Sequence, residues 1–341
     1  MKKIIIASII FLSFNCNAQT KMGDLPQLVD PFPVVIKGND LVFIDDYSIY
    51  VYSLEPYELK AKFAKQGDGS YDLKYTPYFT IQDNIIIATD YLKSIWFTKN
   101  SDVIKVKDYK DFPDFNTNME MVLIPIKENY IRITVSHELS KRYVDLYNSK
   151  YEKIKRLYEG LYDWKTPNGK INTLPYRIDV ACYQDKIFVT DTEKGFFIKV
   201  FDSNGNEIRT IDKNYEIEDV KITENDKNAI AGFIKTSQPE WLYNAIKTNS
   251  YYYKNYPKIN YAMFSDENIY ITTYRKKDNM NEIINLDLNG NIKRKGFAEI
   301  KALKLYRGIL RFDPYTIDNG FLYEIAKNND GKWFLYRTSI N

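Results

Sequence analysis

The 341-residue sequence predicts an all-β fold, namely a six-bladed β-propeller of four-stranded antiparallel blades with a two-helix insertion around residues 223–250. Three observations lead to this prediction. A short β-rich run recurs six times, the runs are spaced as propeller blades are, and helix signals are concentrated in one interval. The 44% hydrophobic and 16% aromatic residues provide for a large core.

The six copies of the β-rich run are residues 41–44, 85–88, 130–133, 187–190, 269–272 and 321–324. Polar residues that suit tight turns precede them, and these are Asp40, Asp83, Glu128, Asp185, Glu267 and Asn319-Gly320. The runs start 44, 45, 57, 82 and 52 residues apart, and a blade needs roughly 40–50 residues. The competing architecture is two separate β-sandwiches. It does not predict that the β-rich run recurs at a regular spacing through the middle of the chain.

A second β-rich run follows each copy, which indicates hairpins. Two of the turns that come next contain Asn204-Gly205 and Asn289-Gly290, and Asn-Gly supplies the positive φ angles of primed hairpin turns. Residues 207–209 and 292–294 then predict solvated outer strands. Each unit therefore has at least three strands, and the spacing accommodates four.

The interval of 82 residues predicts an insertion. Residues 223–226 are typical of a helix N-terminus and precede Ile230 and Ile234 at helical spacing. Residues 237–240 form a capping box that predicts a second helix, which carries Trp241.

Residues 1–18 are typical of a bacterial export signal. Two lysines precede an apolar run of 11 residues, 4–14, which is too short for a bilayer that needs roughly 20. Small residues at Cys16 and Ala18 predict cleavage before Gln19, leaving a propeller domain of residues 19–341. In the alternative, residues 12–16 are a lipobox and Cys16 is lipid-modified. Both alternatives predict an exported protein that is periplasmic, outer-membrane-anchored or secreted, without a transmembrane span.

Charge and composition exclude several classes of function. The chain has 48 Lys and Arg against 45 Asp and Glu, and removal of Lys2 and Lys3 leaves 46 − 45 = +1. Without clustered positive charge, nucleic acid is excluded as a partner. One His and two Cys exclude most zinc, haem and iron–sulfur sites. Cys182 is expected to be buried and inert.

Three segments resemble the six-bladed β-propellers related to NHL repeats and TolB-like proteins, which are common among exported bacterial proteins. They are residues 65–73, 186–191 and 198–206. The chain departs from the pattern at Ser70, where the family has Pro. Because the shared motifs shape blades, the resemblance implies fold and location more than chemistry.

Residues at strand ends are the first candidate site, because radial closure would bring them to one mouth of the channel. They are Asp45, Asp90, Arg132, Asp191 and Arg275. Convergent carboxylates could bind a divalent cation such as calcium or place a general base beside a substrate. In the alternative, each Asp caps the turn that follows it.

The aromatic residues after the insertion are the second candidate site. Tyr252 and Tyr256 belong to a segment with more tyrosines than one buried face accommodates, so we expect a binding surface for a small molecule, a glycan or a protein.

No catalytic constellation is recognisable. The sequence lacks a Gly-x-Ser-x-Gly motif, and its one imidazole, His137, lies in a polar segment that predicts a hairpin tip. We therefore expect a monomeric, non-catalytic protein without a cofactor that binds a ligand or protein partner at the cell envelope. The alternatives are a metal-dependent hydrolase or lactonase, a class that shares the six-bladed fold, and a scaffold component of an envelope assembly.

Overall fold

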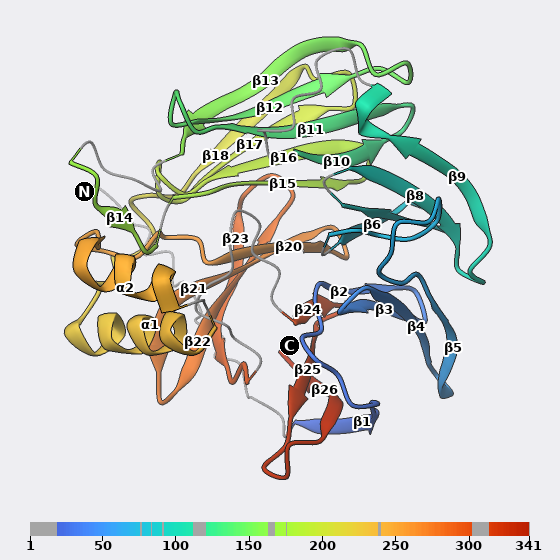
Figure 1. Cartoon of the computed structure of the whole chain (residues 1–341). Coiled ribbons are helices and arrows are strands. Elements are labelled where there is room, and N and C mark those ends of the chain that lie inside the picture. Colours follow the sequence, from blue (N-terminus) through green and yellow to red (C-terminus); the bar gives the residue numbers. More distant parts are fainter. Residues whose placement is uncertain are drawn as a thin grey trace, which may run out of the picture.

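The computed structural model describes residues 19–75, 77–82, 84–90, 92–111, 121–162, 168–174, 176–237, 240–301 and 314–340. Within these ranges, six four-stranded antiparallel sheets are arranged radially around a central channel (Figure 1). The protein is therefore a six-bladed β-propeller, which confirms the predicted fold class. None of the helices in these ranges is long and apolar enough to cross a membrane.

Blades 1–5 are each built from four consecutive strands. Blade 1 consists of β2 (Val34–Lys37), β3 (Asp40–Asp45), β4 (Ser48–Leu54) and β5 (Tyr57–Phe63). Blade 2 consists of β6 (Tyr78–Gln82), β7 (Ile85–Thr89), β8 (Lys93–Thr98) and β9 (Val103–Asp108), and the short helix η1 (Tyr109–Asp111) follows it. Blade 3 consists of β10 (Met121–Ile126), β11 (Asn129–Ser136), β12 (Lys141–Tyr147) and β13 (Lys153–Leu161). Blade 4 consists of β15 (Ile178–Tyr183), β16 (Lys186–Asp191), β17 (Phe197–Asp202) and β18 (Glu207–Asp212). Blade 5 consists of β20 (Tyr261–Ser265), β21 (Asn268–Lys277), β22 (Met280–Asp287) and β23 (Ile292–Ala298). The first strand of each blade borders the channel, and the repeated run found in the sequence is the second strand.

Blade 6 combines the two ends of the chain. It contains β24 (Tyr315–Asp318), β25 (Phe321–Lys327) and β26 (Trp333–Ser339), and its fourth strand is β1 (Thr20–Asp24). Antiparallel pairing sets Thr20 opposite Arg337 and Asp24 opposite Phe334. The ring is thus closed by backbone hydrogen bonds between residues about 300 positions apart in the sequence, a strand that the sequence analysis did not assign.

Neighbouring blades pack face to face, which explains why the repeated runs are continuously apolar. In β3, Leu41 and Phe43 belong to the cluster shared with blade 6, whereas Val42 and Ile44 belong to the cluster shared with blade 2. Because successive side chains of a strand point to opposite faces, a strand covered on both faces has no polar alternation. Similar clusters join blades 4 and 5 and blades 5 and 6.

Where the residues are described, tight polar turns join the first and second strands of the blades, as the polar residues before the repeated runs predicted. Both central residues have positive φ angles at Gln184-Asp185 (47° and 57°) and at Asp266-Glu267 (51° and 59°). The same holds at Asn319-Gly320 (49° and 70°). Primed turns of this kind match the twist of the two strands that they connect.

The predicted insertion lies between β18 and β20 and contains helices α1 (Glu224–Ser237) and α2 (Glu240–Asn249), which lie beside blade 5 (Figure 1). A parallel pair of short strands, β14 (Ile171–Asn172) and β19 (Ser250–Tyr251), ties the insertion to the segment after blade 3. The α1 N-terminus is capped as predicted. The Asp226 amide donates to Thr223 Oγ1 at 3.2 Å, and the Thr223 amide donates to Asp226 Oδ2 at 2.8 Å.

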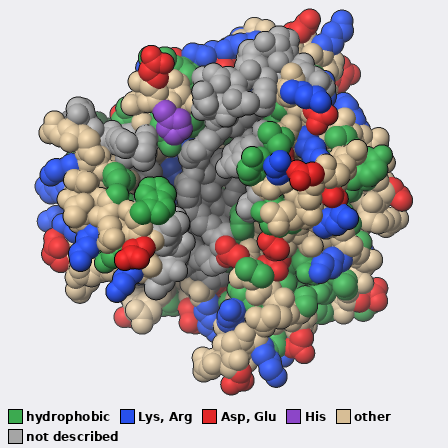
Figure 2. Space-filling view, viewed as in Figure 1, with side chains coloured by type: hydrophobic (Ala, Val, Ile, Leu, Met, Phe, Trp, Pro, Cys, Tyr) green, Lys and Arg blue, Asp and Glu red, His purple; other side chains and the backbone are tan. Residues whose placement is uncertain are grey.

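The surface carries charges of both signs. Figure 2 shows Lys and Arg side chains interspersed with Asp and Glu side chains over one face of the molecule. This face therefore has no extended field of one sign of the kind that attracts a polyanion.

Candidate functional site

Four of the five strand-end candidates lie at the same end of the propeller. The second strand of each blade runs antiparallel to the first, so its end lies beside the start of the channel-lining strand. Asp45, Asp90, Asp191 and Arg275 occupy this position in blades 1, 2, 4 and 5. Arg132 lies within β11, opposite Leu123 of β10.

The carboxylate of Asp45 is buried and holds a backbone segment. Its Oδ1 accepts hydrogen bonds from the amides of Val29 at 2.9 Å and Asp30 at 2.6 Å. These donors belong to the chain between β1 and β2. Asp45 therefore fastens that connection against blade 1.

The carboxylates of Asp90 and Asp191 cap the turns that follow them. Asp90 Oδ1 accepts from the amides of Leu92 and Lys93 at 2.7 and 2.9 Å. Asp191 Oδ1 accepts from the Glu193 amide at 3.0 Å, and its Oδ2 accepts from the Tyr158 hydroxyl at 2.7 Å. This geometry is the capping role weighed against the ligand-binding role in the sequence analysis.

The two arginine candidates also make contacts within the protein. Arg132 is 1% exposed, and its guanidinium donates to the Tyr147 hydroxyl at 3.1 Å. Arg275 donates to Glu282 Oε1 at 3.3 Å and forms an ion pair with Glu218 at 3.6 Å. Arg275 thus connects β21 to the chain that leads into the insertion.

Of the two tyrosine candidates, Tyr256 is part of the core of the insertion. It is 7% exposed, and its ring stacks on Tyr274 with centroids 4.2 Å apart. Burial and the charge of Asp226, with which its hydroxyl is hydrogen-bonded, raise the pKa of Tyr256. Tyr252 is half-buried against the same cluster, with the Lys227 ammonium 5.7 Å from its ring centroid.

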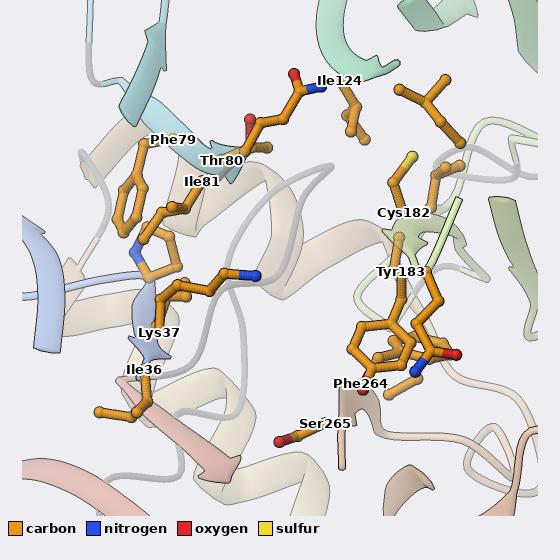
Figure 3. Close-up of a pocket in the computed structure, with 18 of the residues that line it drawn as sticks. Ile36, Lys37, Phe79, Thr80, Ile81, Ile124, Cys182, Tyr183, Phe264 and Ser265 are labelled. Atoms are coloured by element: carbon orange, nitrogen blue, oxygen red, sulfur yellow. The ribbon is translucent and has the colours of Figure 1, made fainter. Parts of the chain in front are cut away.

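The described residues enclose a cavity of about 800 Å³ in the central channel. Residues from the first strands of blades 1–5 and the β24–β25 turn of blade 6 line it. Its wall is apolar along much of its length, and Figure 3 shows Ile36, Ile81 and Phe264 on this wall. None of the seven residues nominated from the sequence lines this cavity.

Charged side chains from several blades line the same cavity, and they are Lys37, Lys127, Asp179, Asp185, Asp266 and Asp318. Five of them lie in or beside the turns between first and second strands, so this mouth is at the opposite end from Asp45, Asp90 and Asp191. Lys127 and Asp185 form an ion pair at 3.0 Å, and Arg177 lies 3.5 Å from Asp179.

The carboxylate of Asp318 is held firmly at this mouth. Its Oδ1 accepts from Ser265 Oγ at 2.5 Å and its Oδ2 accepts from Asn319 Nδ2 at 2.8 Å. Despite these bonds, burial and the charge of Asp266 raise the pKa of Asp318. Burial, together with the charges of Asp266 and Asp318, raises the pKa of Tyr270 to about 12.

Cys182 and His137 lie in different blades, Cys182 in β15 of blade 4 and His137 after β11 of blade 3. Cys182 lines the cavity and is partly exposed, whereas a buried position was expected. Desolvation raises its pKa to about 12, so the thiol is protonated at neutral pH and is a poor nucleophile. His137 lies in the β11–β12 turn, as predicted, with its ring edge-to-face against Tyr162 at 5.2 Å.

Binding of a divalent cation was one of the alternatives considered for convergent strand-end carboxylates. Across the ranges that the structure describes, no group of three or more His, Cys, Asp or Glu residues could hold a metal ion. Cys16, the candidate for lipid modification, and the rest of the predicted export signal lie outside those ranges.

The residues that line the cavity were not predicted, because the repeat visible in the sequence is the second strand of each blade and the lining comes mainly from the first. A partial signal was present: among the turn residues that precede the repeated runs, Asp185 and Asn319 also line the cavity. They were interpreted as turn formers only.

Comparisons with known proteins give alignments with solved structures. No protein-family model and no curated protein matches the sequence. Among solved structures, the Myceliophteria thermophila Cps50 (Swd1) β-propeller domain aligns over 95% of this chain and 100% of its own, with 8% identity and a TM-score of 0.44. The Neurospora crassa Pan2 WD40 domain aligns over 97% and 98%, with 9% identity and a TM-score of 0.44. Kluyveromyces lactis Hsv2 aligns over 89% and 96%, with 11% identity and a TM-score of 0.37.

Proposed function

We propose that this propeller is an exported, monomeric, non-catalytic binding protein whose ligand occupies the central cavity. The observation that carries the proposal is the cavity itself. Its volume of about 800 Å³ lies within the roughly 300–1,000 Å³ that ligand sites enclose. It combines apolar side chains along its wall with polar and charged groups, most of which lie at one mouth, and small-molecule sites also combine apolar and polar groups.

The chemistry of the nominated residues supports binding over catalysis. Asp45, Asp90 and Asp191 direct carboxylate oxygens at backbone amides, and the lone imidazole packs against a tyrosine. The metal-dependent hydrolase therefore has less support than the binding protein.

Location outside the cytoplasm is part of the proposal. It is supported by the charged and apolar pattern of residues 1–18 and by the resemblance of residues 65–73 and 198–206 to NHL-related propellers. Fractionation of cells that express the full chain tests it. Recovery of a product starting at Gln19 outside the cytoplasm supports cleavage, whereas loss of membrane association in Cys16→Ala indicates a lipid anchor.

Blocking the channel tests the binding function. Ala262 lies on the cavity wall, so Ala262→Trp should fill part of the cavity. Ile208 is 42% exposed on the outer strand β18 and provides a matched control, Ile208→Trp. We expect the neutral dye Nile red to bind the wild type and Ile208→Trp with equal affinity and stoichiometry, measured by fluorescence. Equal binding to Ala262→Trp would place the dye elsewhere and contradict the proposal.

A further inference from the structure

The charges that line the cavity are unequal in number. Among the described lining residues, four aspartates face two lysines. The ion pair of Lys127 with Asp185 and the contact of Asp179 with Arg177 balance two of the aspartates. The remaining charges are those of Lys37, Asp266 and Asp318, so this sector of the mouth has one excess negative charge.

Asp266 and Asp318 are fixed close to each other by the β24–β25 turn. The Asn319 amide donates to Asp266 Oδ2, while Asn319 Nδ2 donates to Asp318 Oδ2 at 2.8 Å. Ser265, next to Asp266 in the chain, donates to the other oxygen of Asp318. One asparagine therefore bridges the two carboxylates, and little side-chain entropy remains to be lost when a ligand binds them.

The two carboxylates repel each other. Burial and the charge of Asp266 both disfavour ionised Asp318, which is why its pKa is raised. A cation placed between them would relieve this repulsion and form charge-assisted hydrogen bonds in a partly desolvated site.

An apolar surface continues from the acidic pair into the channel. In Figure 3, Phe264 and Ser265 follow each other at the lower side of the cavity, and Cys182 and Tyr183 lie above them. Ile36 and Ile81 face them from the other side. A hydrocarbon chain that enters past Asp266 would be enclosed by these side chains.

We infer that the cavity binds an amphiphile with a positively charged head group, such as a protonated alkylamine, whose head lies between Asp266 and Asp318 and whose apolar body lies along the channel wall. This inference rests on the proposed function and specifies its ligand class.

Lys37 can be used to test whether the head group of the ligand is positively or negatively charged. Its side chain extends from β2 into the open space of the cavity in Figure 3, and its charge lowers the pKa of Asp318. It therefore competes with a cationic head group and would attract an anionic one. Neutralising Lys37 and neutralising the aspartates should change affinity in opposite directions.

Calorimetry at pH 7 with n-octylammonium chloride and sodium octanoate tests the inference. We expect the wild type to bind octylammonium more tightly than octanoate. Compared with the wild type, Asp318→Asn and Asp266→Asn should each bind octylammonium about tenfold more weakly. Lys37→Met should bind octylammonium more tightly than the wild type does. Asp330→Asn, which makes the same change of net charge on an exposed turn, is the control and should bind as the wild type does. Thermal melts of each variant verify that it is folded.

Two outcomes overturn the inference and separate it from the proposed function. If octanoate binds more tightly and Lys37→Met weakens it, while Ala262→Trp abolishes binding, the cavity is a binding site for anions. If neither probe binds and Nile red binding is unaffected by Ala262→Trp, the proposed function fails as well.

Discussion

Lys99, in the turn after β8 of blade 2, donates a hydrogen bond to Asp40 of blade 1, with 2.5 Å between Nζ and Oδ2. Lys60 of β5 donates to the other carboxylate oxygen at 2.8 Å. Burial alone would raise the pKa of Asp40, but the two ammonium groups outweigh burial and lower it. Asp40 is thus a charged clamp between two blades.

Replacing this clamp should destabilise the fold in a pH-dependent way. We expect Asp40→Asn to lower the free energy of unfolding by about 2 kcal/mol at pH 7. The pKa is lower in the folded state than the roughly 3.9 of an unfolded chain, so the stabilisation is present above about pH 4 and is lost as pH falls through the folded-state pKa. Urea unfolding at pH 7 and pH 3 measures the difference. Asp68→Asn, at an exposed ion pair with Lys74, should cost under about 0.5 kcal/mol, and an equal cost at both sites would contradict the clamp.

Substitution of two glycines by alanine should change the stability of the protein in opposite directions. A Cβ on Gly23 in β1 would lie 2.0 Å from the Tyr57 ring, whereas a Cβ on Gly232 in α1 meets nothing within 4 Å. We expect Gly23→Ala to destabilise the protein by about 1–3 kcal/mol through overpacking. Gly232→Ala should stabilise it by up to about 1 kcal/mol through helix propensity. Thermal unfolding of both variants shows whether each is less or more stable than the wild type. A Gly23→Ala variant as stable as the wild type would show that β1 can shift without a loss of stability.

The Tyr158 hydroxyl joins blades 3 and 4 by its bond to Asp191. Tyr158→Phe removes the hydroxyl that donates to the buried Asp191 carboxylate, and one carboxylate oxygen loses this hydrogen bond. We therefore expect the free energy of unfolding to fall by about 2 kcal/mol. Tyr71→Phe, at a residue 59% exposed, is the control and should be neutral. Nile red binding should not change in either variant. A binding defect in Tyr158→Phe would instead return Asp191 to the list of ligand contacts.

The cap of α1 should affect the insertion locally. Thr223→Ala removes the hydroxyl that accepts from the Asp226 amide, at a cost of about 1 kcal/mol, and Thr223→Ser should retain it. Burial favours a higher pKa for Asp226, but the bonds from Thr223 and Tyr256 outweigh it and lower the pKa. The cap therefore stabilises α1 above about pH 4 and weakens as pH falls. Hydrogen exchange should increase in residues 224–237 of the Ala variant; exchange that rises equally in the blades would exclude a local role.

The second strands were predictable because both of their faces are covered. Residues 41–44 in β3 and 85–88 in β7 are buried almost throughout, so they form unbroken apolar runs at a fixed period. The same argument predicted α1 and α2, where capping residues precede helical periodicity.

The closing strand and some of the first strands carry no such pattern. β15 and β20 have one side open to the channel, and they mix polar with apolar residues. β1, with the sequence TKMGD, is held mainly through its backbone pairing with β26. Hydrogen bonds to the peptide group depend little on side-chain type, so composition could not identify this strand.

The strand-end aspartates show a different limit of the sequence. Local sequence placed Asp45 at a strand end, but its partners are amides of Val29 and Asp30 on the chain before β2. Only the three-dimensional path of that chain decides whether a carboxylate faces a peptide group or a channel. The acidic pair of Asp266 and Asp318 likewise joins residues from two blades.

The pairing of Thr20 with Arg337 also constrains when the molecule can fold. A ribosome delivers the first of these residues long before the second, so β1 must wait unpaired until β26 has been synthesised. Such late, long-range closure makes for slow folding.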